Sequence, residues 1–145
     1  VGVPGAKLDV EAGYEQSSVR DPLSGMARPI SGNDWYWAEA AFRHDIPKTD
    51  LAWGFSASSY HSRDRYYLNE TQRDYEGPVF ARIFAEHKDV MGMTVRGELG
   101  NVLGARNTPR RIVYAGRRPD SAVLFREEAD RGIGPIFALL VKGSF

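Results

Sequence analysis

The fold is decided by the stretch Gly134-Pro135-Ile136-Phe137-Ala138-Leu139-Leu140-Val141-Lys142-Gly143-Ser144-Phe145. It predicts a strand of about ten residues, the length that a tilted β-strand needs to cross a bilayer. One face of that strand carries Phe137, Leu139, Val141 and Phe145, and the other face is mixed. Such an apolar face invites aggregation in water, whereas lipid covers it in a barrel. We therefore expect these four residues to face a membrane, in the closing strand of a barrel.

The composition excludes several classes of function. The 145 residues include 19 basic and 19 acidic ones, so net charge gives no argument for binding nucleic acid. There are no cysteines, which excludes disulfides, thiolate metal sites and cysteine nucleophiles. No apolar window approaches the roughly 18 residues of a transmembrane helix. A membrane barrel does not need such a window, because every second residue faces its lumen.

Alternation with a period of two recurs along the chain and predicts strands. No convincing amphipathic helix lies between them, so the predicted class is all-β, an antiparallel meander of about six long strands. The strands are expected at Ala6–Val19, Trp35–His44, 51–58, Glu76–His87, Met93–Leu103 and Val123–Phe145, the last with a break near residues 132–135.

The connections between these strands alternate in length. Residues 20–33, 63–75 and 107–120 form long connections, the last with an expected strand at Arg111–Tyr114. Residues 45–50 and 88–92 form short turns. Outer-membrane barrels have short periplasmic turns and long extracellular loops. This parity predicts that the C-terminus is periplasmic and that the cut from a longer parent chain lies before Val1.

The face opposite the apolar one carries charges of both signs, which suits either a lumen or the solvated surface of a soluble sandwich. Tyr14, Tyr36 and Trp53 lie near strand ends on the apolar side, where an interfacial aromatic girdle is expected. The long strands also favour the barrel.

An ordered set of segments resembles the C-terminal part of a TonB-dependent outer-membrane receptor. Its carriers are residues 20–25 (RDPLSG), 28–32 (RPISG), 43–47 (RHDIP), 86–96 (EHKDVMGMTVR), 100–103 (GNVL), 111–114 (RIVY) and 133–145. The resemblance implies a barrel of about 22 strands with a plugged lumen, which imports scarce nutrients such as iron–siderophore complexes, cobalamin or saccharides. Residues 1–145 would be the last part of that barrel, in the outer membrane of a Gram-negative bacterium.

The same resemblance implies the partners. These are the lipid bilayer and lipopolysaccharide, the barrel-assembly machinery at the last strand, TonB through a plug region that this chain lacks, and a small-molecule substrate of the parent protein. No nucleic acid is expected. The transported substrate does not follow from the sequence.

No residue pattern predicts catalysis, a cofactor or a metal. His44, His61 and His87 are scattered, and the pairs Glu127-Glu128 and Asp9-Glu11 show no sign of desolvation. A basic cluster in a loop, in and just before the third long connection, is expected to be solvated or to face lipopolysaccharide: Arg106, Arg110, Arg111, Arg117 and Arg118. The chain is therefore not expected to be an enzyme. The alternatives are a soluble all-β ligand-binding module (a sandwich or jelly roll) and another outer-membrane barrel, such as a porin or a barrel enzyme.

Overall fold

The computed structural model describes residues 2–143. All of its strand pairings are antiparallel, and the described residues contain no helix, which confirms the predicted all-β class. In particular, no helix among these residues has the length and apolar character needed to span a membrane.

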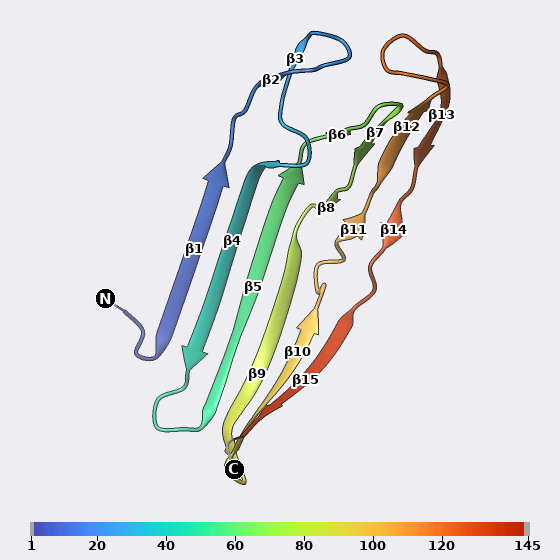
Figure 1. Ribbon diagram of the computed structural model, residues 1–145. Coiled ribbons are helices and arrows are strands. Elements are labelled where there is room, and N and C mark those ends of the chain that lie inside the picture. The colour runs from blue at the N-terminus through green and yellow to red at the C-terminus, as the bar shows by residue number, and fades with distance from the viewer. Residues whose placement is uncertain (1, 144–145) are drawn as a thin grey trace.

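A central sheet of six strands dominates the structure (Figure 1). Its strands are neighbours in the order in which the chain visits them, which makes the sheet a meander. The strands are β1 (Ala6–Tyr14), β4 (Asp34–Asp45), β5 (Leu51–Ser62), β9 (Phe80–Val90), β10 (Met93–Gly100) and β15 (Ile136–Lys142). β1 and β15 form its two edges, and neither has a second partner strand among residues 2–143.

Smaller sheets extend the same layer beyond one end of the central sheet (Figure 1). They have the strand orders β2-β3, β13-β12-β7-β6 and β14-β11-β8. The strands are β2 (Val19–Arg20), β3 (Ala27–Arg28), β6 (Arg65–Tyr66), β7 (Glu70–Arg73), β8 (Glu76–Gly77), β11 (Arg106–Asn107), β12 (Arg110–Tyr114), β13 (Val123–Glu128) and β14 (Arg131–Gly132). The predicted long connections therefore contain short strands of their own.

Tight turns close the opposite end of the central sheet. Met91 and Gly92 join β9 to β10 with φ angles of 55° and 80°. Positive φ at both central residues is typical of the type I′ turn, whose twist matches that of a β-hairpin. The Asp89 carboxylate accepts a hydrogen bond from the Gly92 amide at 2.8 Å, which helps to fix the turn.

Several predicted boundaries differ from the structure. The third strand continues to Ser62, the fourth continues to Val90, and the fifth ends at Gly100 rather than Leu103. The first strand ends at Tyr14 rather than Val19, and the fourth begins at Phe80, because residues 76 and 77 form the separate strand β8. The expected break near residues 132–135 is confirmed, since β14 ends at Gly132 and β15 begins at Ile136. A second break, between β13 and β14, was not predicted. Phe145 lies outside the described residues.

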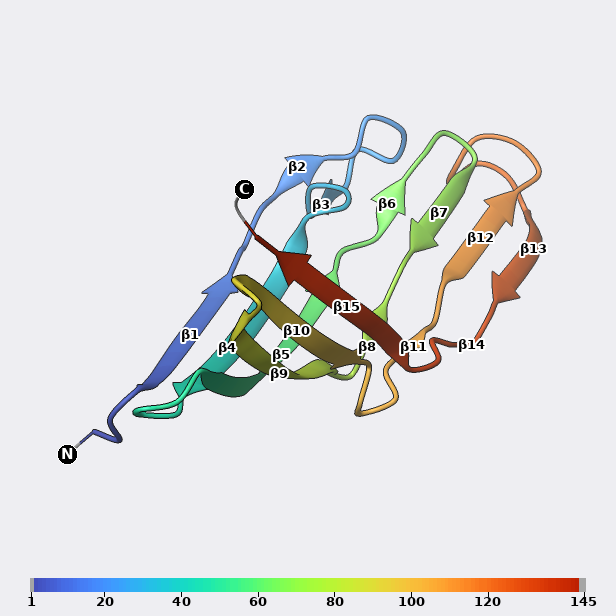
Figure 2. The same cartoon turned by 90° about the horizontal axis from the view of Figure 1, so that it is seen from below.

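The structure is a single curved layer without a packed hydrophobic core (Figure 2). Its buried apolar residues are Ala52, Ala81, Ala105 and Val113, and no large side chain is fully buried among the described residues. The accessible surface is 9914 Å², whereas a compact monomer of 16.2 kDa exposes about 7,500 Å². The excess of roughly 2,400 Å² is what a sheet leaves exposed when no second layer covers it.

Candidate functional site

One face of the central sheet is an exposed apolar surface, called here the apolar face. Across all six strands, directly paired residues form a continuous row on it: Leu8, Phe42, Phe55, Ile83, Leu99 and Phe137. A parallel row of smaller side chains contains Val10, Ala40, Ala57 and Ala81. Leu8 is 62% exposed and Phe55 41%. An apolar patch that extends over six strands is far larger than soluble monomers expose, so it marks a surface that another phase or partner covers.

Three of the four predicted membrane-facing residues, Phe137, Leu139 and Val141, lie on this face at the β15 edge, and the fourth, Phe145, is outside the described residues. Phe137 is paired with Leu99, Leu139 with Gly97, and Val141 with Val95. Phe137 is 79% exposed and Leu139 is 73% exposed. Since both rows and the edge strand present the same face, the last strand continues the apolar surface rather than ending it.

Aromatic side chains line the end of the apolar face nearest the short turns. Trp53 lies opposite His44, and its indole Nε1 donates a hydrogen bond to His44 Nδ1 at 3.2 Å. The ring of Phe42 packs against Trp53 at 5.3 Å and against Phe55 at 5.5 Å between centroids. An apolar ring with a polar tip suits a boundary between an apolar phase and water.

A second aromatic group, called here the aromatic belt, lies at the other end of the apolar face. It consists of Tyr14, Trp35, Tyr36, His61 and Tyr75, in a chain of ring contacts between 5.1 and 6.3 Å. A bulge between Asp34 and Tyr36 brings Trp35 into the belt. Tyr36 and His44 are eight residues apart on β4, or roughly 26 Å along the strand. At a strand tilt of about 40°, this spacing corresponds to roughly 20 Å along the membrane normal, somewhat less than the apolar band of about 25 Å of an outer-membrane barrel.

The opposite face of the central sheet carries a network of paired charges. Arg43 bridges Glu86 at 2.6 Å and Asp45 at 3.0 Å, and Lys88 also pairs with Asp45, at 2.7 Å. The pairs between β4 and β9 reach across the small residues Ala52 and Gly54 of β5, which lies between these two strands. The charges at this end of the face are therefore compensated by one another.

Phe84 lies on the charged face, which resolves an ambiguity in the alternation of β9. The guanidinium of Arg96 stacks over its ring at 3.7 Å, and the Arg96 side chain also pairs with Glu98 at 2.9 Å. A cation over an aromatic face is attracted by the ring quadrupole, so a phenylalanine is accommodated among charges.

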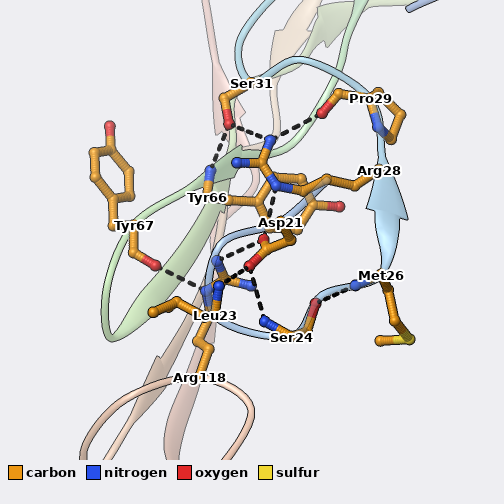
Figure 3. A network of polar contacts seen from close by, with 10 residues as sticks. All are labelled: Asp21, Leu23, Ser24, Met26, Arg28, Pro29, Ser31, Tyr66, Tyr67 and Arg118. Atoms are coloured by element: carbon orange, nitrogen blue, oxygen red, sulfur yellow. Dashed lines mark hydrogen bonds and ion pairs between the residues drawn. The ribbon is translucent and has the colours of Figure 1, made fainter. Parts of the chain in front are cut away.

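A network around Asp21, called here the loop lock, joins three connections at the end of the central sheet away from the short turns (Figure 3). These are called here the outer connections. Asp21 Oδ2 accepts hydrogen bonds from Arg28 Nε at 2.7 Å and from Arg118 Nη2 at 3.3 Å. Both guanidiniums lie over the ring of Tyr66, at 4.8 and 5.0 Å, and Arg118 Nε donates to the Tyr67 carbonyl at 2.8 Å. The connections around residues 21, 66 and 118 are therefore held to one another by a buried carboxylate.

The environment of Asp21 keeps it ionised. The largest cause is the hydrogen bond that the Leu23 amide donates to Oδ1 at 2.8 Å, which holds the pKa of this carboxyl well below its usual range. Burial opposes this shift, while the hydrogen bonds from Arg28, Ser24 and Arg118 act in the same direction as Leu23. Asp21 thus carries a full negative charge at neutral pH.

The structure divides the predicted basic cluster between strands and loops. Arg106 belongs to β11 and Arg110 to β12, whereas both were expected in a loop. Arg111 lies in β12, as the expected strand Arg111–Tyr114 implies. Four of the five arginines are matched by carboxylates: Arg106 by Asp130 (2.6 Å), Arg110 by Glu128 (3.0 Å), Arg111 by Glu70 (2.5 Å) and Arg118 by Asp21 (3.3 Å). The segment is therefore no free cationic patch.

The loop lock and most of the aromatic belt do not follow from sequence reasoning. Residues 21–25 (DPLSG) have the composition of a turn, in which an aspartate commonly accepts hydrogen bonds from the backbone that follows it. This composition could have indicated a structural role for Asp21. Its partner Arg118 lies 97 residues away in the chain. His61 belongs to the belt, whereas His44 and His87 lie near the short turns.

Comparison with protein-family models, with curated proteins and with solved structures gives no match. Among residues 2–143, no group of three or more histidine, aspartate or glutamate side chains is placed to hold a metal ion. The acidic pairs Asp9-Glu11 and Glu127-Glu128 lie on exposed strand positions.

Proposed function

We propose that the chain is part of the wall of an outer-membrane β-barrel of the TonB-dependent receptor type and acts in the uptake of a scarce nutrient, such as an iron–siderophore complex, cobalamin or a saccharide. The observation that carries the proposal is the apolar face, which is exposed across six strands and bounded by aromatic rings at both ends. Lipid is the solvent that such a surface requires. The sequence resemblance supplies the receptor family.

The charged face supports the same proposal, because a barrel needs a polar lumen behind its apolar exterior. On this face Arg43 and Arg96 pair with acidic neighbours, so their charges are compensated within the protein. The two open edges, β1 and β15, are where further strands would continue the wall.

A soluble sandwich is less well supported. It requires a second sheet packed about 10 Å above the apolar face. Among residues 2–143 the smaller sheets extend the layer instead of covering it (Figure 1), and side chains such as Leu139 remain mostly exposed.

The proposed partners follow from the two faces. The apolar face contacts the lipid bilayer, its outer end contacts lipopolysaccharide, and the last strand engages the barrel-assembly machinery. TonB acts through the plug region of the parent protein. The wall itself carries out no covalent chemistry.

The absence of native cysteine allows a direct test by single-cysteine substitution. Ala57 lies in the middle of the apolar face, and its neighbour Ser58 lies on the charged face opposite Glu39. In isolated outer membranes we expect Ala57→Cys to resist both charged and uncharged maleimides, because its thiol cannot ionise in the hydrocarbon core. Ser58→Cys should react with both reagents.

Denatured protein provides the control, since both cysteines should then react alike with either reagent. Equal labelling of the two variants in intact membranes, or recovery of the protein in the soluble fraction without detergent, would contradict the proposal.

A further inference from the structure

A hollow of about 200 Å³ lies directly beyond the aromatic belt. Its walls include Trp35, His61, Arg63, Asp64, Tyr66 and Arg73. It therefore combines two guanidinium groups and three aromatic rings with one carboxylate.

The hollow lies on the side of the apolar face. His61 is paired with Tyr36 in the sheet register and stacks on its ring at 5.7 Å between centroids. Tyr75 packs on His61 at 5.1 Å. Arg73 precedes Tyr75 by two residues and lines the hollow together with His61. The side chain of Arg73 therefore lies on the same side of the layer as the rings of His61 and Tyr75. A molecule on the apolar face would meet this hollow at its outer end.

The hollow has an excess of positive charge. Arg73 is neutralised by Asp64, with 2.5 Å between Nε and Oδ1. Arg63 donates from Nη2 to the Glu15 carbonyl at 2.6 Å and lies over the Trp35 ring at 5.9 Å. Among the described residues Arg63 makes no ion pair with a carboxylate. An anion that enters the hollow therefore meets one guanidinium whose charge is not already compensated.

The surface between the belt and the middle of the sheet carries only small side chains, which leaves room for hydrocarbon chains. Three of these residues are paired across adjacent strands: Ala12 on β1, Ala38 on β4 and Ser59 on β5. One molecule could thus place acyl chains on this lane, sugar rings against the aromatic belt and a phosphate at Arg63.

We propose that this hollow binds the phosphorylated headgroup of an outer-leaflet glycolipid whose acyl chains lie on the apolar face. This inference rests on the proposed function, since it requires the apolar face to be in the membrane. It commits to a lipid rather than a free anion because the hollow continues directly into the apolar face through the aromatic belt.

The sheet supplies a matched control for the test. Arg73 bridges Asp64 on the side of the hollow, whereas Arg65 bridges Asp74 at 3.0 Å and is absent from the walls of the hollow. Arg65→Gln and Arg73→Gln therefore remove the same charge and one comparable ion pair from the neighbouring strands β6 and β7. Arg63→Gln removes the uncompensated guanidinium.

Native mass spectrometry of the protein extracted in detergent, titrated with bisphosphorylated lipid A, gives the readout. We expect Arg63→Gln to weaken lipid A binding about tenfold and Arg73→Gln severalfold, because charge-assisted contacts to phosphate are lost. Arg65→Gln should bind like the unaltered protein. Lipid A without its phosphates should bind weakly to every variant.

Equal binding by all variants, or an equal loss in Arg65→Gln, would overturn the inference. Displacement of lipid A by millimolar inorganic phosphate would identify the hollow as a site for free anions and overturn the choice of a lipid. The circular dichroism signal of each variant confirms that it is folded. The labelling pattern of Ala57→Cys and Ser58→Cys is measured separately, so failure of the membrane proposal is distinguishable from failure of the headgroup site.

Discussion

The carboxylate of Asp21 accepts hydrogen bonds from its own turn and from Arg118, which lies 97 residues further along the chain. This side chain is buried, yet its pKa is held well below the usual range, mainly by the Leu23 amide. A buried charge is tolerated when each of its lone pairs finds a donor. Asp21 therefore functions as the centre of the loop lock.

Replacing Asp21 with asparagine should loosen the lock without removing the turn. The amide oxygen can still accept from the Leu23 and Ser24 amides, but the ionic partners Arg28 and Arg118 lose their counter-charge. We expect cleavage by an added protease in the connections around residues 21, 66 and 118 to become severalfold faster. Unchanged cleavage would show that the lock contributes nothing to loop order.

The same residue predicts a pH dependence. Because the folded-state pKa of Asp21 lies below the unfolded value of about 3.9, its contribution to stability is fully present above that value. The contribution declines as pH falls further toward the folded-state pKa. Protease resistance of the outer connections, measured with an acid-stable protease, should therefore fall below about pH 4. The Asp21→Asn variant should lack this particular transition.

At the scale of the element, Gly54 of β5 lies where neighbouring atoms leave no room for a side chain. Gly54 is buried, and a Cβ at this position would meet the Phe42 carbonyl oxygen and lie 2.8 Å from Cζ of Phe84. Gly97 on β10 also lies in the central sheet, but a Cβ there would find no atom within 4 Å. The two glycines thus differ in their packing but not in their secondary structure.

We expect Gly54→Ala to lower the free energy of unfolding by about 1–3 kcal/mol, because the added methyl group forces a backbone carbonyl and a ring apart. Gly97→Ala should leave stability unchanged or raise it by up to about 1 kcal/mol, since it reduces the freedom of the unfolded chain. Urea unfolding followed by tryptophan fluorescence measures both. Equal effects of the two substitutions would mean that the close approach at Gly54 is not a constraint.

At the scale of the whole molecule, no second layer covers the apolar face among residues 2–143. A row of paired apolar residues crosses six strands, and the surface is roughly 2,400 Å² larger than that of a compact monomer. Burial of apolar side chains within the chain therefore contributes little to the free energy of folding. Substitutions on the apolar face should then show, through their effect on stability, whether lipid or water surrounds it.

A lysine in the middle of the apolar face tests that phase. Under the membrane proposal, Ala57→Lys should lower the free energy of unfolding from lipid vesicles by about 2–4 kcal/mol, the cost of a cation near the bilayer midplane. Ser58→Lys places the same charge on the other face, opposite Glu39, and should change stability by less than about 1 kcal/mol. Similar effects of the two lysines would argue against lipid on the apolar face.

The sequence by itself determined the all-β antiparallel class and the set of residues that share the apolar face. The reason is that successive side chains on a strand point to opposite faces, so a period of two is visible locally. The same rule placed Phe137, Leu139 and Val141 together. It was ambiguous at Phe84, where an apolar residue faces charges because Arg96 stacks on it.

Only the tertiary structure decided which distant residues meet. The acidic partners of the arginines in the third connection, the junction of Arg118 with Asp21, and the gathering of Trp35, His61 and Tyr75 into one belt depend on strand register and on a bulge. These contacts join residues far apart in the chain, and local alternation carries no information about them. The sequence therefore specified the two faces of the central sheet, and the pairing of the strands specified the loop lock, the aromatic belt and the hollow beyond it.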